Sequence, residues 1–154
     1  MADHLATVMV RDAATRDVVS LKDDDILDDV RAWVSSGAGQ TTHQGFPVVN
    51  AEGLLVGVVT RRDILDPKNP GTVPLRDVVR RAPVVVYEDS TLRDAADQMV
   101  VEEVGRLPVV KREEPLVLVG ILSRSDLLTA HRPRLTAANR MRRVRKITTW
   151  KRST

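Results

Sequence analysis

The sequence contains no cysteine. A disulfide framework, a thiolate metal site and a cysteine nucleophile are therefore excluded. Its three histidines, His4, His43 and His131, are too far apart in sequence for the usual spacing of zinc ligands. No serine lies in a nucleophile elbow, and no glycine-rich phosphate loop is present. These absences argue against an enzyme, and we expect neither a metal site nor a required cofactor.

Long apolar runs are also missing. The longest, residues 116–122, is far shorter than the roughly 20 residues of a membrane helix. The N-terminus lacks the charged and apolar regions of a secretory signal. Because 42% of the residues are apolar and 29% are charged, we expect a soluble globular chain.

Negative charge is absent from the C-terminal part of the chain. No Asp or Glu follows Asp126, whereas nine Lys and Arg residues do. Removing these nine from the 24 basic residues leaves 15 against 21 acidic residues, so a body of about −6 carries a tail of +9. The tail is interpreted either as solvated and disordered, as a contact for anionic lipid, or as a nucleic-acid contact. With 3% aromatic residues, stacking on bases finds little support.

What the chain does contain is an internal repeat. The segment Gly57–Leu65 returns without a gap as Gly120–Leu128, and Phe46–Val49 returns as Leu107–Val110. A stretch rich in proline and glycine separates the two copies. We therefore expect a first unit, a linker, a second unit and a basic tail, at residues 1–66, 67–74, 75–130 and 131–154.

Each copy shows the same order of hydrophobic patterns. A short β-branched run comes first, Val18-Val19 or Val84-Val85, and apolar residues at helical spacing follow it. Two apolar runs around a turn come next, and a last helix begins at Thr60 or Ser123. The sequence therefore predicts an α+β fold of two units, each with the order strand, helix, strand, strand, helix.

A hydroxyl precedes a carboxylate by three residues at the start of both last helices, in Thr60-x-x-Asp63 and Ser123-x-x-Asp126. One interpretation is a capping box, in which each side chain bonds the backbone of the other residue. The other is a ligand site, in which the helix N-terminus favours an anion and the carboxylate accepts from a ribose diol. The residues alone leave both open.

The order of elements, together with the hydrophobic-Pro-Val-Val strands and the Gly-x-x-Thr/Ser-x-x-Asp turns, resembles the CBS domain, which occurs in tandem as a Bateman module. The resemblance covers residues 8 to 128. It implies a pseudo-twofold pair of units with short mixed sheets and helices on the outer faces. It also implies a non-catalytic regulatory module that senses ATP, ADP or AMP and forms a homodimer.

The resemblance also implies where a nucleotide would bind. In CBS pairs the matching aspartate, here Asp63 or Asp126, holds the adenosine ribose, and the matching Thr60 or Ser123 lies beside the ribose or phosphate. Arg106 stands where some relatives carry a phosphate-contacting arginine, and its counterpart is Gly45. Arg61 and Arg124 follow the cap residues and would either reach the phosphate or stay solvated. The family places adenine against residues that also suit a plain sheet core: Val18, Val19, Pro47, Val48, Val84, Val85, Pro108 and Val109.

A narrower similarity concerns Arg31-Ala32-Trp33 and the segment His43–Val49, which resemble the first CBS domain of ClC chloride channels and transporters. The arginine-rich residues 130–135 are also similar to the ends of bacterial members. This implies a module on the cytoplasmic side of the membrane, attached to a ClC transmembrane domain whose chloride transport it modulates. The alternatives are a ligand-free dimerisation module and a free-standing CBS protein that binds nucleic acid through its basic tail.

Overall fold

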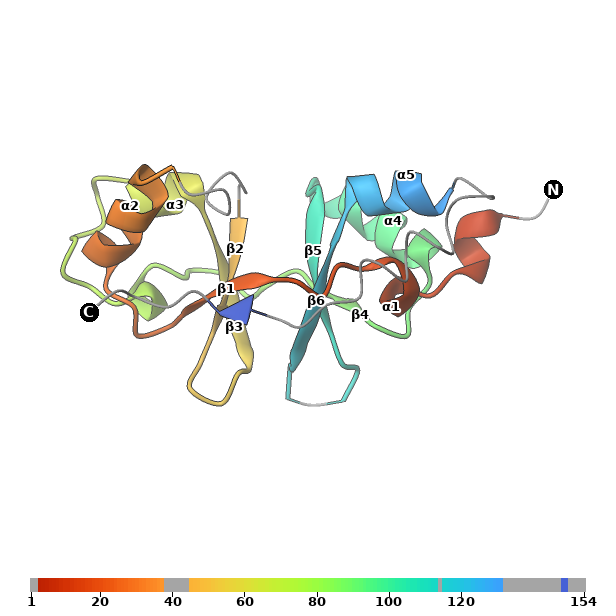
Figure 1. The fold of residues 1–154 in the computed structure, drawn as a ribbon, viewed down its shortest axis with the longest axis horizontal. Helices are drawn as coiled ribbons and strands as arrows, with labels where there is room; N and C mark the ends of the chain where they lie inside the picture. The colour runs from red at the N-terminus through yellow and green to blue at the C-terminus, as the bar shows by residue number, and fades with distance from the viewer. Residues whose placement is uncertain (1–2, 38–44, 114, 132–147, 150–154) are drawn as a thin grey trace. The chain divides into compact units, whose positions relative to one another are not determined.

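The computed structural model describes residues 3–37, 45–113, 115–131 and 148–149 (Figure 1). The chain divides into two compact units, which we name after the aspartate of the repeated turn that each contains. The Asp63 unit comprises residues 19–83 and 148–154, and the Asp126 unit comprises residues 1–18 and 84–147.

The Asp63 unit is built on a sheet with the strand order β3-β2-β1-β7. Strand β1 runs parallel to β2, and β2 runs antiparallel to β3. A turn joins β2 to β3, in which Gly53 has a φ of 79° and the Asn50 Oδ1 accepts hydrogen bonds from two backbone N–H groups. The elements are β1 (Val19–Lys22), α2 (Leu27–Ser35), β2 (Gly45–Val49), β3 (Leu55–Thr60), α3 (Arg61–Leu65), η3 (Leu75–Asp77) and β7 (Thr148–Thr149).

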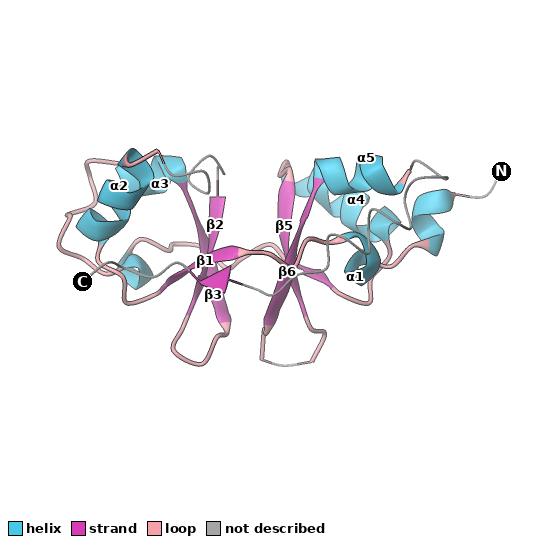
Figure 2. Cartoon of the chain, in the orientation of Figure 1, coloured by secondary structure: helices cyan, strands magenta, loops and turns pink. Residues whose placement is uncertain are grey.

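The Asp126 unit repeats this arrangement in a sheet with the order β4-β5-β6. The register is also repeated, because Arg106 pairs with Ser123 as Gly45 pairs with Thr60. Its elements are η1 (His4–Thr7), α1 (Val10–Ala13), β4 (Val86–Tyr87), α4 (Leu92–Glu102), β5 (Arg106–Val110), β6 (Leu118–Ser123) and α5 (Arg124–Ala130). Two small mixed sheets with helices confirm the predicted α+β class (Figure 2).

Each unit has its own hydrophobic core, in which alternate residues of the central strand participate. Phe46 and Val48 of β2 belong to one core, and Leu107 and Val109 of β5 belong to the other. Because successive strand side chains point to opposite faces, the prolines between them, Pro47 and Pro108, lie on the other face of each sheet. This alternation decides which of the expected site residues share a face.

The segment before each repeat packs on the other repeat, which the sequence did not indicate. The Leu92 N–H at the start of α4 donates to the Val8 carbonyl (2.9 Å), and the Leu27 N–H at the start of α2 donates to the Val73 carbonyl (2.9 Å). Residues 1–18 therefore belong with the second repeat, and the linker and η3 belong with the first. The predicted boundaries at residues 66, 74 and 130 separate the repeats along the sequence, but they do not coincide with the two packed units.

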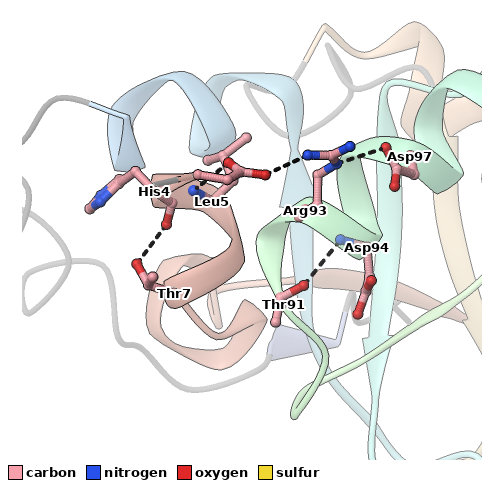
Figure 3. A network of polar contacts seen from close by, with 8 residues as sticks. His4, Leu5, Thr7, Thr91, Arg93, Asp94 and Asp97 are labelled. Carbon is pink, nitrogen blue, oxygen red and sulfur yellow. Dashed lines mark hydrogen bonds and ion pairs between the residues drawn. The ribbon is translucent and has the colours of Figure 1, made fainter. Parts of the chain in front are cut away.

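Side chains reinforce the docking of the N-terminal segment on α4 (Figure 3). Asp3 caps η1 by accepting from the Leu5 N–H (3.1 Å), and it also forms an ion pair with Arg93. Arg93 in turn contacts Asp97 one helical turn further along α4 (3.2 Å). These groups are exposed, so they orient the segment more than they stabilise it.

The basic tail contributes one short strand to the described structure. Strand β7 runs parallel to β1, with Thr148 opposite Val19 and Thr149 opposite Ser20. It therefore covers an edge of the Asp63 sheet that would otherwise present unpaired backbone groups. The rest of the tail, residues 132–147 and 150–154, lies outside the described residues, as do His43 and Gln44. Among the residues that are described, no helix is long and apolar enough to cross a membrane.

Candidate functional site

The Thr60-x-x-Asp63 turn forms a closed capping box where β3 ends and α3 begins. The Thr60 Oγ1 accepts from the Asp63 N–H (3.1 Å), and the Asp63 Oδ2 accepts from the Thr60 N–H (2.9 Å). The Asp63 side chain is half-buried. The capping interpretation therefore holds for this turn, and it fixes the direction of the carboxylate.

The Ser123-x-x-Asp126 turn has the same box with one more bond. The Asp126 Oδ2 accepts from both the N–H (2.9 Å) and the Oγ (3.1 Å) of Ser123, while the Asp126 N–H donates to the Ser123 Oγ (3.3 Å). Only 2% of Asp126 is exposed. A carboxylate offers about four acceptor positions, so a capping role and a bond to a sugar hydroxyl are compatible.

Arg106 gives the Asp126 turn a positive neighbour. Because Arg106 pairs with Ser123, it lies at the same end of the sheet as the capping box. Burial lowers the pKa of Arg106, and the charge of the Asp126 carboxylate partly offsets this effect. The structure therefore places Arg106 close enough to Asp126 for their charges to interact.

Arg124, the residue after the Ser123 cap, lies close to the start of β5. Its backbone N–H donates to the Gly105 carbonyl (3.0 Å), and its guanidinium carbon lies 3.1 Å from where a Cβ of Gly105 would be. Its side chain is turned back along the sheet edge, although the residue is exposed. The Asp126 unit thus has Arg106 at the first position of β5, and the Arg124 side chain lies against Gly105, the residue before it.

The Asp63 unit has no charge at the position equivalent to Arg106, because Gly45 stands there, opposite Thr60. Arg61, which follows the Thr60 cap, is exposed at the start of α3. The two turns therefore share their backbone geometry and differ in their electrostatics.

Arg31 holds the far end of α3, a role that the sequence analysis missed. Its guanidinium donates to the backbone carbonyls of Ile64 (2.8 Å), Asp66 (2.8 Å) and Asn69 (2.9 Å). The Ile64 carbonyl belongs to the last turn of the helix and the other two follow it, at the end where a cation is favoured. Arg31 thereby joins α2, α3 and the linker.

Trp33 also has a clear role in the fold, since it packs edge-to-face on Phe46 with ring centroids 5.3 Å apart. The Arg31-Ala32-Trp33 sequence that suggested a ClC module is therefore accounted for by the packing of the Asp63 unit itself.

The residues expected to line an adenine slot do not all share one face. Val48 and Val109 lie in the hydrophobic cores, whereas Pro47 and Pro108 are buried on the opposite faces of the sheets. The others precede the central strands in sequence, Val18 being buried and Val19, Val84 and Val85 half-buried. The side chains of Val48 and Val109 thus serve the core, as the alternative interpretation held.

Gly57 and Gly120 are explained by close approach of the chain itself. A Cβ at Gly120 would lie 2.9 Å from the Thr15 carbonyl oxygen, where residue 15 forms a β-bridge with Ile121. A Cβ at Gly57 would clash with the Val79 side chain. The absence of a side chain at each glycine therefore leaves room for a segment from outside its own repeat to pack against the strand.

The profile of the CBS domain matches residues 10–67 and 75–132, which together make up well over half of the chain. The chain belongs to the CBS domain family. A CBS pair is generally a regulatory, non-catalytic module. Within the described residues, no group of three metal-ligating side chains is placed to hold a metal ion.

Relatives of this CBS protein range from proteins of similar length to larger enzymes. An uncharacterized protein of Methanocaldococcus jannaschii is 28% identical over 159 residues, which cover 80% of this chain and 90% of that protein. The inosine-5'-monophosphate dehydrogenase of the same organism is 36% identical over 84 residues, but the match covers 54% of this chain and only 16% of the enzyme. The enzyme's name therefore says nothing of the activity of this chain.

Solved CBS structures share the fold. The structure of CBSX2 in complex with AMP has a TM-score of 0.67 and 28% identity, covering 80% of this chain and 96% of that chain. The CBS domain of a bacterial CNNM/CorC family Mg2+ transporter in complex with ATP has a TM-score of 0.67, with coverage of 82% and 89%. Its identity is 20%, so this second comparison supports the fold alone.

Proposed function

We propose that this CBS pair is a regulatory module that binds an adenine nucleotide, AMP, ADP or ATP, at the Asp126 unit. Asp126 would accept from the ribose diol, Ser123 would lie beside the ribose or phosphate, and Arg106 would contact the phosphate. The observation that carries the proposal is the closeness of Arg106 to the Asp126 capping box. The complex of CBSX2 with AMP supports the choice of ligand.

The chemistry of the Asp126 turn suits a phosphorylated ribose. Three hydrogen bonds hold Asp126 to Ser123, so the carboxylate is already oriented before a ligand arrives. Arg106 is half-buried, and a guanidinium in a partly dehydrated site forms strong charge-assisted bonds to phosphate. A ligand with both a diol and a phosphate uses both groups.

The adenine would lie against the residues that precede and form the central strand, in this unit Val84, Val85, Pro108 and Val109. Because the Val109 side chain belongs to the core, its contribution would come from the backbone. In the Asp63 unit the equivalent site consists of Asp63, Thr60, Val18, Val19, Pro47 and Val48. We propose that it takes a less charged ligand than the Asp126 site, because Gly45 replaces the arginine.

Thermal-shift titration tests the proposal directly. A ligand at 100 times its Kd stabilises the folded state by about 2.7 kcal/mol, which moves the Tm measurably. We expect a shift with AMP, ADP or ATP that is clearly reduced in Arg106→Gln and retained in Arg62→Gln, an exposed control on α3. If none of the three nucleotides at millimolar concentration moves the Tm, the nucleotide function is wrong and the ligand-free dimerisation module takes its place.

We also propose that the module is a homodimer. Large apolar side chains are exposed on two helices that pack together, Val100 (78%) and Val101 (77%) on α4 and Leu128 (70%) on α5. A second copy of the chain would cover them. Light scattering should give the mass of a dimer, and Val100→Lys should reduce it to that of a monomer.

An attached ClC-type membrane domain stays a prediction from the sequence. Its support was the similarity of Arg31-Ala32-Trp33, of the segment His43–Val49 and of residues 130–135, and the packing of the Asp63 unit now accounts for Arg31 and Trp33. The reading frame upstream of Met1 tests it, since a ClC domain would contain many apolar segments of membrane-spanning length. The location on the cytoplasmic side of the membrane depends on the same test.

The basic tail stays a candidate contact for anionic lipid, with nucleic acid as the less supported partner. Co-sedimentation with vesicles containing phosphatidylserine, compared with vesicles of phosphatidylcholine alone, tests the lipid contact. A salt-dependent gel shift that is lost on deleting residues 131–154 would favour nucleic acid.

A further inference from the structure

We infer that strand β7 and a nucleotide compete for the Asp63 unit, so that the end of the basic tail controls whether this second site is open. The inference rests on the proposed nucleotide function, and it adds what regulates the occupancy of the Asp63 site. The observation that carries it is the pairing of Thr148 and Thr149 with Val19 and Ser20 of β1. Val19 is one of the residues against which the adenine of this site would lie.

The competition concerns the backbone of β1. A base that is recognised by backbone groups needs N–H and C=O groups that are not already bonded, and in a sheet these are found on an edge strand. The Asp63 sheet has the order β3-β2-β1-β7, so the side of β1 that faces away from β2 is the edge beside Val19. Strand β7 occupies this edge, because strand pairing uses the same backbone groups of β1.

The occupied edge lies at the end of the sheet that carries the Asp63 turn. Continued toward the start of β1, the pairing of β1 with β2 sets Val19 level with Phe46. Phe46 pairs with Val59, the residue directly before Thr60 of the capping box. The turn and the edge beside Val19 are therefore about two strand spacings apart, roughly 10 Å, a span that one nucleoside can bridge from its ribose to its base.

The Asp126 unit differs at the corresponding edge. Its sheet has the order β4-β5-β6, and in the described part of the chain no strand pairs with the outer side of β4. The strand registers make Val84 the counterpart of Val19. The adjacent Val85 carbonyl accepts from the side chain of Gln98 on α4 (2.8 Å), so this stretch is held by its own helix. One unit thus has a strand at the edge that the base would use, and the other has none.

This difference predicts unequal occupancy of the two sites. Competition divides the affinity of the Asp63 site by the fraction of molecules in which β7 has left β1. With pairing as the major state, that fraction is about 10% or less, and the affinity falls about tenfold or more. AMP that saturates the Asp126 site should therefore leave the Asp63 site largely empty.

The test counts the AMP molecules bound per chain by titration calorimetry on the full chain. The parent protein should show one site, and a variant with both Thr148→Pro and Thr149→Pro should show a second, with an affinity about tenfold higher than in the parent. Proline has no N–H to donate to a strand partner. The matched control, Thr148→Val with Thr149→Val, keeps the strand and should behave like the parent. All tail charges are retained in both variants.

Two further measurements identify the gained site. Amide exchange at Val19 and Ser20 should rise in the proline variant as β7 leaves β1. Adding Asp63→Ala to that variant should remove the second site, because the acceptor for the ribose is lost. The inference is overturned if exchange at these residues does not rise, if it rises without a gain in AMP binding, or if the gained site survives Asp63→Ala.

The outcomes separate this inference from the proposed function. One AMP per chain in both the parent and the proline variant would refute only the competition. No binding to the parent and one AMP bound to the proline variant would refute the Asp126 site and leave the competition standing. No binding to either would refute the proposed function, and the inference with it.

Discussion

The two units share a scaffold and differ at the start of their central strands. Both contain the same strand pairing, the same irregularity at the last step of the central strand and the same capping box. At the equivalent first position of that strand, however, one unit has Gly45 and the other has Arg106. Duplication has therefore preserved what builds the fold, while single positions decide the charge of each candidate site.

The entry to the first long helix differs as well. At the start of α4, the Thr91 side chain caps the helix by accepting from the Asp94 N–H (3.2 Å). At the start of α2 the cap residue is Ile26, whose side chain accepts no hydrogen bond. The linker compensates, because the Gly71 carbonyl accepts from the Asp28 N–H (2.9 Å). The start of α2 is thus held by the linker, whereas the start of α4 is held by the Thr91 cap.

The largest expected effect comes from removing the contact of η3 with the core of the Asp63 unit. Leu75 of η3 is fully buried in the Asp63 core, so Leu75→Ala should lower the free energy of unfolding by about 2–4 kcal/mol. Urea denaturation measures this, with the exposed neighbour Arg76→Ala as the control, for which a change within about 0.5 kcal/mol is expected. An equally small change for Leu75→Ala would show that η3 is not part of this unit.

A second variant sharpens the difference between the two last helices. Arg31→Met removes the donors to three carbonyls at the end of α3 and should cost about 1–3 kcal/mol. Amide exchange should increase in α3 and not in α5. The exposed Arg62→Met is the matched control on α3, and a uniform increase in both helices would argue against a local role of Arg31.

Acid should weaken the docking of the N-terminal segment of the Asp126 unit. The hydrogen bond from Arg93 holds the pKa of Asp3 below its ordinary value of 3.8. A carboxyl with a lowered folded pKa contributes stability above its unfolded pKa, and this contribution is lost as the pH falls through the folded pKa. Amide exchange in η1 should therefore rise relative to α2 below about pH 4, and the pH dependence should disappear in Asp3→Asn. Since both groups are exposed, the effect is small.

The smallest expected effect concerns strand β7. Deleting residues 148–154 should expose the backbone of β1 to faster amide exchange, while β4, which has no such partner in the described structure, stays unchanged. The Tm should move little, because only two residue pairs are lost. Unchanged exchange at residues 19–22 would mean that β7 does not pair stably in solution.

Much of the fold could be predicted because it follows local patterns. Alternation and helical spacing located α2 and α4, and the repeated turns located both capping boxes. The packing of the N-terminal segment on the second repeat, and of the linker on the first, could not be predicted. It depends on backbone contacts between residues far apart in sequence, such as Leu92 with Val8. Such contacts leave no periodic pattern.

The candidate site was predicted in part for the same reason. The pairing of Arg106 with the Asp126 turn followed from aligning the two repeats, whereas the role of Arg31 depends on three-dimensional neighbours. The sequence analysis used Arg31 only as evidence of similarity to a family. In the structure it binds carbonyls at the C-terminal end of α3.

The most direct test of the account is the exchange of residues between the two strand starts. Calorimetric titration with AMP should show that Arg106→Gly weakens binding at least about tenfold, since one charge-assisted contact to phosphate is lost. Adding Gly45→Arg to that variant should restore part of the affinity through the Asp63 site. An AMP affinity that is the same in the parent protein and in Arg106→Gly would contradict the claim that Arg106 makes the Asp126 site the one for a charged nucleotide.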